Sequence, residues 1–212
     1  MTHDKKVKVK FVEQILNIML EDIKEYIQFI NISSEDLVLF EWKPPRSFKS
    51  FILDMNIIKE NKISDIFFHI NKGNLKIVHI RKHNLIYTIG ANDLQYQILE
   101  ALLEYIDKQF NEMYDLDVVL SYSNTNPAIF KHFKNELDQI IENFYSLKLV
   151  KKVDVLCRVC KATLPMYVKK SIMESETSFP VPIVYIHKGH AIVTYIDKDF
   201  VVRGVELVHI NS

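Results

Sequence analysis

Glycine is scarce in this chain. Only four of the 212 residues are glycine, and they stand far apart, at Gly73, Gly90, Gly189 and Gly204. Nucleotide-binding loops of the G-x-G-x-x-G and P-loop types, and the G-x-S-x-G elbow of serine hydrolases, all need closely spaced glycines. The sequence therefore excludes these nucleotide-binding and hydrolase motifs.

The chain also lacks an excess of charge of either sign. Its 27 basic and 27 acidic side chains cancel, which removes the strong positive field that usually accompanies nucleic-acid binding. Arginine occurs only at Arg46, Arg81, Arg158 and Arg203. Sites built from bidentate guanidinium clamps on phosphate or carboxylate are therefore not expected.

Cysteines and long apolar runs are few as well. The two cysteines, Cys157 and Cys160, cannot form the disulfide framework of a secreted protein. No stretch approaches the roughly 18 apolar residues of a membrane span. The basic start MTHDKKVKVK is followed by an apolar run that Glu13, Glu21 and Asp22 interrupt, unlike a signal peptide. We expect a cytoplasmic protein without a transmembrane segment.

The apolar residues that are present make up ordinary globular patterns. Hydrophobic residues amount to 48% of the chain, enough for a sizeable core. Apolar spacing at i, i+3, i+4 and i+7 predicts helices over residues 11–30, 93–113 and 127–146. Short apolar runs between turn residues predict strands over 37–42, 48–58, 63–70, 75–80 and 85–89. The Asn126-Pro127 pair is a typical helix start.

The pattern changes after about residue 150. A short strand is expected at 153–156, residues 167–173 are compatible with a helix, and 179–210 returns to strands with turns at 188–189 and 197–199. We therefore predict an α+β fold in two parts. Residues 1–150 form an antiparallel sheet packed with helices, and residues 151–212 form a small β-rich module.

The strongest chemical pattern lies in this second part. Cys157 and Cys160 form a C-x2-C pair, and His187 and His190 form an H-x2-H pair, with 26 residues between them. Zinc prefers four nitrogen or sulfur ligands in a tetrahedron, and two short loops that offer two ligands each are a common solution. This arrangement resembles a zinc ribbon in which histidines replace the second cysteine pair. It predicts a structural zinc ion bound by these four residues.

Two other interpretations of the same residues stay open. His187 and His190 can be a cross-strand pair at a two-residue hairpin turn, with the cysteines as ordinary core residues. The run Cys157-Arg158-Val159-Cys160-Lys161, followed by Pro165, also resembles the active-site segment of thioredoxins. That resemblance implies a thiol oxidoreductase, in which one cysteine has a lowered pKa.

The other candidates carry weaker signals. His79 and His83 lie four apart, but in a region that is expected to be strand and turn. Asp115 with Asp117, and Asp197 with Asp199, are most simply solvated loop carboxylates. No catalytic set and no cofactor-binding residues besides the four zinc ligands can be singled out, so the chain is expected not to be an enzyme.

The middle of the chain carries a resemblance of another kind. Residues 83–144 contain HNLIYTIGAND, then LQYQILEALLEYIDKQFNEMYDLDVVLSYSN, then PAIFKHFKNELDQIIENF. This segment resembles the second half of longin-like domains, which occur in the small subunits of adaptor complexes. A helix before the first strands is closer to the related roadblock arrangement. The resemblance implies a strand, a long helix, an acidic loop and a further helix.

These patterns together give the functional expectation. The longin- or roadblock-like resemblance implies a non-catalytic scaffold that binds small GTPases, trafficking-type complexes or homologous scaffold subunits, and a homodimer is a further expectation. A zinc-containing nucleic-acid-associated protein is the main alternative. It rests on basic residues in the second part: Lys151, Lys152, Arg158, Lys161, Lys169 and Lys170.

Overall fold

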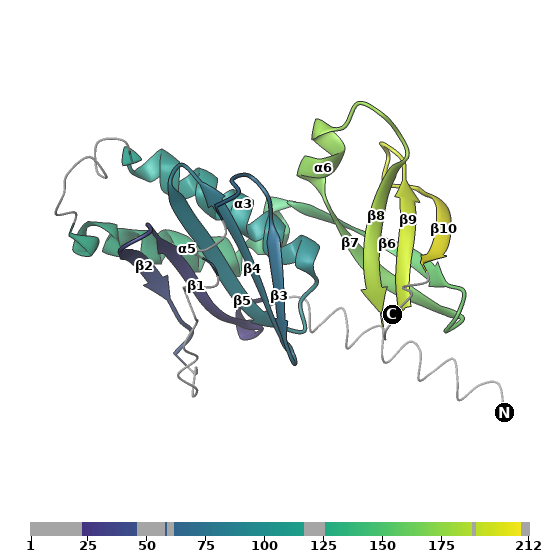
Figure 1. Cartoon of the computed structure of the whole chain (residues 1–212), viewed down its shortest axis with the longest axis horizontal. Helices are drawn as coiled ribbons and strands as arrows, with labels where there is room; N and C mark the ends of the chain where they lie inside the picture. The colour runs from purple at the N-terminus through teal and green to yellow at the C-terminus, as the bar shows by residue number, and fades with distance from the viewer. Residues whose placement is uncertain (1–22, 46–57, 59–61, 117–125, 188–189, 209–212) are drawn as a thin grey trace. The chain divides into compact units, whose positions relative to one another are not determined.

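The computed structural model describes residues 23–45, 58, 62–116, 126–187 and 190–208. They form two compact units. The first comprises the described residues up to Leu94 and those from Leu103 to Leu147, and the second comprises Gln95–Leu102 and the described residues from Lys148 onward. The fold is α+β with antiparallel sheets, as the sequence predicts (Figure 1).

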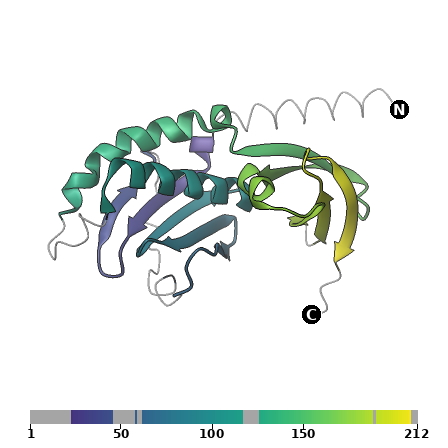
Figure 2. The same cartoon turned by 90° about the horizontal axis from the view of Figure 1, so that it is seen from above.

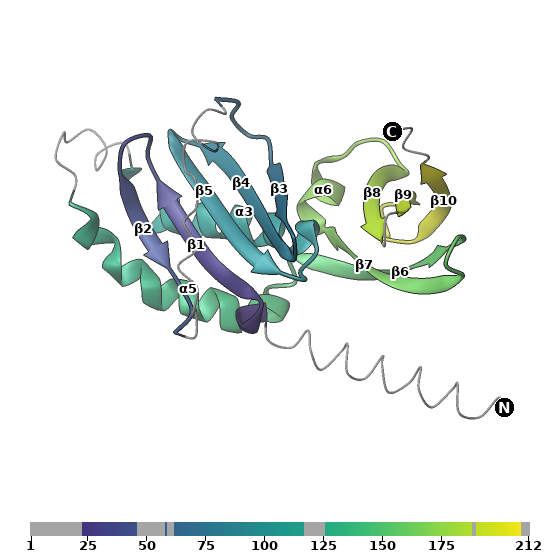
Figure 3. The same ribbon diagram turned by 60° about the horizontal axis from the view of Figure 1, so that its bottom comes forward.

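The first unit is built on a five-stranded antiparallel sheet. Its strands lie in the order β2-β1-β5-β4-β3 (Figure 3). They are β1 (Ile27–Ser33), β2 (Val38–Trp42), β3 (Phe68–Lys72), β4 (Leu75–Lys82) and β5 (Leu85–Asn92). Tight turns join the hairpins: Gly73 has φ +64° after β3, and His83 and Asn84 have φ +48° and +61° between β4 and β5. Positive φ at both central residues suits a two-residue hairpin turn.

Helices cover one face of this sheet (Figure 2). They are α3 (Tyr96–Met113), whose residues from Leu103 belong to this unit, and α5 (Phe133–Glu142), which follows a 3-10 helix at Pro127–His132. The Phe110 ring lies 4.9 Å from that of Phe133 and 6.3 Å from that of Tyr87, both edge to face. Such pairs add to the burial of apolar area, so aromatic rings from α3, α5 and β5 form the centre of the first core.

The opposite face of the sheet carries a row of buried polar side chains. Asn31, Thr88 and His79 are neighbours on β1, β5 and β4, and the His79 ring stacks on Phe68 at 5.3 Å. All three polar side chains are buried, and neither ring nitrogen of His79 has a hydrogen-bond partner among the residues that the structure describes. Burial lowers the pKa of His79 to about 4, and the charges of His69 and Arg81 act in the same direction.

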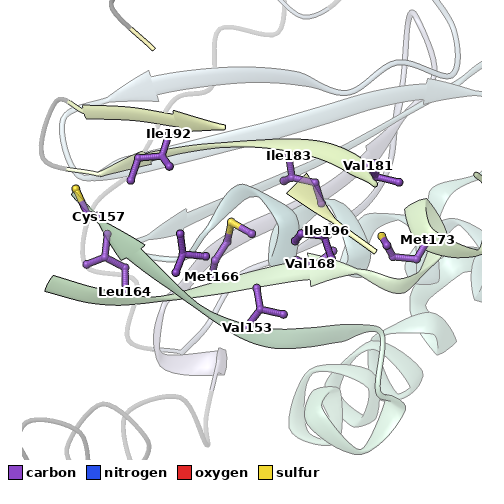
Figure 4. Close-up of a cluster of buried hydrophobic side chains, with 11 residues drawn as sticks. Val153, Cys157, Leu164, Met166, Val168, Met173, Val181, Ile183, Ile192 and Ile196 are labelled. Atoms are coloured by element: carbon purple, nitrogen blue, oxygen red, sulfur yellow. The ribbon is translucent and has the colours of Figure 1, made fainter. Parts of the chain in front are cut away.

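The second unit contains two separate sheets. The β6–β7 hairpin (Val150–Cys157 and Ala162–Lys169) forms one, and β8 (Val181–His187), β9 (His190–Ile196) and β10 (Val202–Val208) form the other, in the order β10-β9-β8. A short helix, α6 (Lys170–Ser175), follows β7. Figure 4 shows the buried side chains that fill the space between the sheets, among them Leu164, Met166, Ile183 and Ile192.

Gln95, just before α3, and the first turns of α3 hold the edge of β7. The side-chain amide of Gln95 donates to the Pro165 carbonyl (2.8 Å) and accepts from the Tyr167 N–H (3.0 Å), as a neighbouring strand would. The Gln97 side chain accepts from the Lys169 N–H at 3.2 Å. Lys169 Nζ lies 2.8 Å from Glu100 Oε2, and both side chains are buried. Residues 95–102 are therefore part of the second unit's structure.

Several predicted elements need correction. Residues 27–30 are strand rather than helix, because Ile27, Ile30 and Ile32 pack into the sheet; residues 11–22 lie outside the described part. The predicted strand at 48–58 lies outside it too, except for Ile58, which is helical. Residues 63–67 precede β3 instead of belonging to it. The expected helix over 167–173 begins only at Lys170, because Tyr167–Lys169 complete β7.

The buried ion pair gives a first prediction. Lys169→Met should lower the free energy of unfolding by about 3–5 kcal/mol, because the Glu100 carboxylate stays buried without its ammonium partner. The double variant Lys169→Met/Glu100→Leu should recover most of this loss in urea titrations. Lys108→Met, at an exposed pair with Glu112 (3.8 Å), serves as the control and should change stability by less than about 0.5 kcal/mol. A single variant as stable as the wild type would contradict the prediction.

His79 gives a second prediction. Its folded-state pKa of about 4 lies below the ordinary value of 6.5, so the unfolded chain binds the proton first. The stabilisation is complete above pH 6.5 and is lost as the pH falls to 4, by about 3 kcal/mol in total. The variant His79→Phe should therefore lose about 3 kcal/mol less than the wild type between pH 7 and pH 4, measured by urea unfolding. Equal losses would show that His79 does not titrate in this range.

Candidate metal centre in the C-terminal unit

Cys157 and Cys160 lie at the turn of the β6–β7 hairpin. Cys157 ends β6, and the Lys161 N–H donates to its carbonyl oxygen at 2.8 Å. Lys161 has φ +55°, which closes the turn. The backbone N–H of Cys160 points at the Cys157 sulfur, with the nitrogen 3.5 Å from Sγ. A turn of this kind places both thiols on the same loop and supplies an N–H donor to one of them.

The surroundings of Cys157 favour its thiolate. The Cys160 N–H lowers the pKa of the Cys157 thiol and the Val159 N–H acts in the same direction, whereas burial opposes them. The Cys157 side chain is only 1% exposed, and Cys160 is partly buried. Zinc binds the thiolate form of cysteine, so these N–H groups suit a metal ligand.

The histidine pair lies at the β8–β9 hairpin. His187 ends β8, His190 begins β9, and the two face each other across the strands. His187 is partly buried and its ring stacks on that of Tyr185 at 6.5 Å. The His190 side chain lies outside the described part of the structure. The backbone of His190 begins β9, two residues before Ile192.

Ile192 connects the two hairpin ends. It belongs to the same buried cluster as Cys157, and Figure 4 shows both at one end of this cluster. A cavity of about 20 Å³, room for about one water molecule, lies beside them. Its lining consists of Cys157, Arg158, Ile192, Val205, Glu206 and Leu207. His190 is about 7 Å along β9 from Ile192, so the cysteine turn and the histidine turn lie at the same end of the unit.

The donor set suits zinc, but the described residues alone do not complete a site. Among the side chains that the structure describes, no group of three or more cysteine, histidine or acidic residues is close enough to hold a metal ion, and that set does not include His190. Two thiols on one turn and two histidines on another match the ligands that structural zinc prefers. The four residues predicted from the sequence therefore remain the candidate ligands.

The weaker candidates have structural roles. Trp42, which is not among the candidates named above, is buried, and its Nε1 donates to Asp138 at 3.1 Å. Asp197 accepts from the Val201 N–H, from the Arg203 side chain and from the Asp199 N–H, and these contacts hold the pKa of its carboxyl low. Asp117 lies outside the described residues.

The local geometry also bears on the alternative interpretations. Pro165 lies in strand β7, whereas the thioredoxin resemblance implies a helix after the cysteines. Of the basic residues considered for nucleic acid, Lys169 is buried in its ion pair, and Lys151 lies over the Phe200 ring, 4.9 Å from its centroid. Neither arrangement adds support to a redox or nucleic-acid function.

Sequence reasoning missed the residues that fasten α3 to β7. Gln95, Gln97 and Glu100 look like ordinary polar positions of an amphipathic helix. Their partners on β7 are about 70 residues away in the chain, and a single sequence carries no signal for such a pairing.

No family model matches the chain, and the search of curated proteins finds no match either. In the described part of the chain, none of the helices has the length and apolar character needed to cross a bilayer.

Proposed function

We propose that this chain is a non-catalytic interaction module, in which a longin- or roadblock-like unit and a zinc-stabilised β unit present surfaces to protein partners. The partners are small GTPases, trafficking-type complexes or homologous scaffold subunits. The function is one of surface complementarity rather than of chemistry.

The observation that carries this proposal is the element order of the first unit. A hairpin, β1–β2, is followed by three strands, β3–β4–β5, and then by the helices α3 and α5 on one face of the sheet. Two strands followed by three strands are common to the longin- and roadblock-like plans, and both plans also place a helix between the two groups of strands. Most of the residues between β2 and β3 where that helix would lie, 46–57 and 59–61, are outside the described part of the structure. The sheet leaves β2 and β3 at its edges, and such edges are used to bind partner strands.

The proposed zinc ion has a structural role in the second unit. Cys157, Cys160, His187 and His190 would hold it, and when bound it would join the tips of two hairpins that belong to separate sheets. A small β unit of this kind gains most from such a tie, since its core is limited.

Metal content tests the zinc part of the proposal. Chain purified without a histidine tag should contain one zinc ion per molecule by mass spectrometry, because four N/S ligands bind zinc tightly at neutral pH. The double variant Cys157→Ser/His190→Ala should lose the metal and the cooperative unfolding of the second unit. His132→Ala, at an exposed position in the first unit, should keep both. Metal-free wild-type protein would overturn the zinc proposal and leave the interaction proposal standing.

Partner binding tests the interaction part. Size-exclusion chromatography of the full chain with a panel of small GTPases, in both nucleotide states, and with homologous scaffold subunits should give at least one stable complex. Specific complexes bury enough surface to survive such a separation at micromolar concentration. Failure to bind any member of the panel, together with failure to self-associate, would contradict the proposed function.

A further inference from the structure

The three-stranded sheet of the second unit has an inner and an outer face. Ile183, Ile192 and Val205 point to the buried cluster, so the residues between them along each strand point away from it. We call these residues the outer face of β8–β10. They are Pro182, Val184 and Ile186 on β8, Ala191, Val193 and Tyr195 on β9, and Gly204, Glu206 and Val208 on β10.

This outer face is apolar. Antiparallel sheets that have water on one side normally carry polar residues there. Here the register places Val184 beside Val193, and Ile186 beside Ala191, which lies beside Val208. Val184 and Ile186 are 63% and 65% exposed. Val208 is 40% exposed, whereas Ala191 in the central strand is only 5% exposed, so the exposed apolar area comes mainly from Val184, Ile186 and Val208. Exposed apolar patches are a feature of interaction sites.

The sequence of β8 fits the same conclusion. The strand reads VPIVYIH, with apolar residues on both faces and no charged residue. Such continuous runs are typical of strands that are covered on both sides. The inner side packs on the buried cluster. The apolar residues on the outer side therefore indicate that another surface packs there.

We propose that the outer face of β8–β10 receives an amphipathic helix of a partner protein, with the helix's apolar side on Val184, Ile186 and Val193 and a basic side chain at Glu206. This inference rests on the proposed function as an interaction module and locates one of its surfaces.

The size of the face suits one helix. Three strands spaced ~4.8 Å apart, each contributing about five residues of ~3.3 Å, give a footprint of roughly 14 by 17 Å. An α-helix is ~10 Å wide and rises 5.4 Å per turn, so about three turns fill this footprint. A stable dimer through a second copy needs roughly 800 Å² from each partner, several times the ~240 Å² of this footprint.

The charge of the face selects the kind of helix. Glu206 is the charged residue among the nine positions, and the Tyr195 hydroxyl donates to its carboxylate at 3.1 Å, which holds it on the face. A lysine or arginine on the incoming helix completes an ion pair, whereas an acidic helix is repelled. The same carboxylate disfavours an anionic lipid surface.

Fluorescence anisotropy of the full chain with labelled 14-residue helical probes tests the proposal. The matching probe carries leucines at i, i+3, i+4 and i+7 with one flanking lysine; a second probe has the same composition in scrambled order, and a third has glutamate in place of the lysine. We expect the matching probe to bind at least tenfold more tightly than the other two. Ile186→Lys should weaken its binding at least tenfold, and Glu206→Lys should reverse the preference between lysine and glutamate probes.

Leu156→Lys is the matched control, since Leu156 is 54% exposed on β6, away from this face. It should bind the matching probe like the wild type, and circular dichroism should show all variants to be folded. Equal binding of the matching and scrambled probes would overturn the proposal, and so would unchanged binding of the matching probe by Ile186→Lys. So would self-association or anionic-vesicle binding that Ile186→Lys abolishes, since the occupant would then be a second copy or a membrane.

The two proposals fail separately. A GTPase or scaffold complex that forms equally well with Ile186→Lys would place the interaction elsewhere and leave the proposed function intact. If the wild-type chain binds the matching probe but forms no complex with any protein of the panel, the proposed function alone is contradicted.

Discussion

The C-terminal unit depends on side-chain packing between two sheets that share no strand. Among the described residues, the strands of the β6–β7 hairpin and of the β8–β9–β10 sheet pair only within their own sheet, so the buried cluster between the sheets supplies much of the cohesion. Lys151 of β6 adds a side-chain hydrogen bond to the Asp199 carbonyl in the β9–β10 turn, at 3.4 Å. Such a core is small, and two further devices act at its borders. Gln95, Gln97 and the Glu100–Lys169 pair fasten β7 to α3. At the other end lie the cysteine and histidine turns, where the proposed zinc ion would tie the hairpins together.

This arrangement also explains the character of the two units. The first unit buries aromatic rings of α3, α5 and β5 between its helices and its sheet. In the second unit, β8 carries apolar residues on both of its faces. Some of the unit's apolar side chains therefore lie outside its interior. The cavity beside Cys157 in this unit has room for about one water molecule.

Local patterns in the sequence predicted a good part of the fold. The apolar stripe of residues 93–113 and the Asn126 cap, which accepts from the Ala128 N–H at 3.0 Å, are local features and are confirmed. The helix predicted over residues 27–30 is wrong, because isoleucines at helical spacing also fit a strand buried on both faces. The strand over Tyr167–Lys169 was missed, since the amides of Gln95 and Gln97 that hold it are distant in sequence. The spacing of the cysteine and histidine pairs is readable from the sequence. That the two turns lie at the same end of the second unit follows only from the packing of Cys157 near Ile192.

Amide hydrogen exchange with and without a zinc chelator tests the central claim, that one metal ion ties the two hairpins of the C-terminal unit. If a bound metal ion ties the hairpins, chelation should speed exchange at least tenfold at Cys160, whose N–H donates to the Cys157 sulfur, and at the β8–β9 turn. Exchange in β5 of the first unit should stay unchanged. Identical exchange with and without chelator at both turns would show that no metal ion ties the two hairpins.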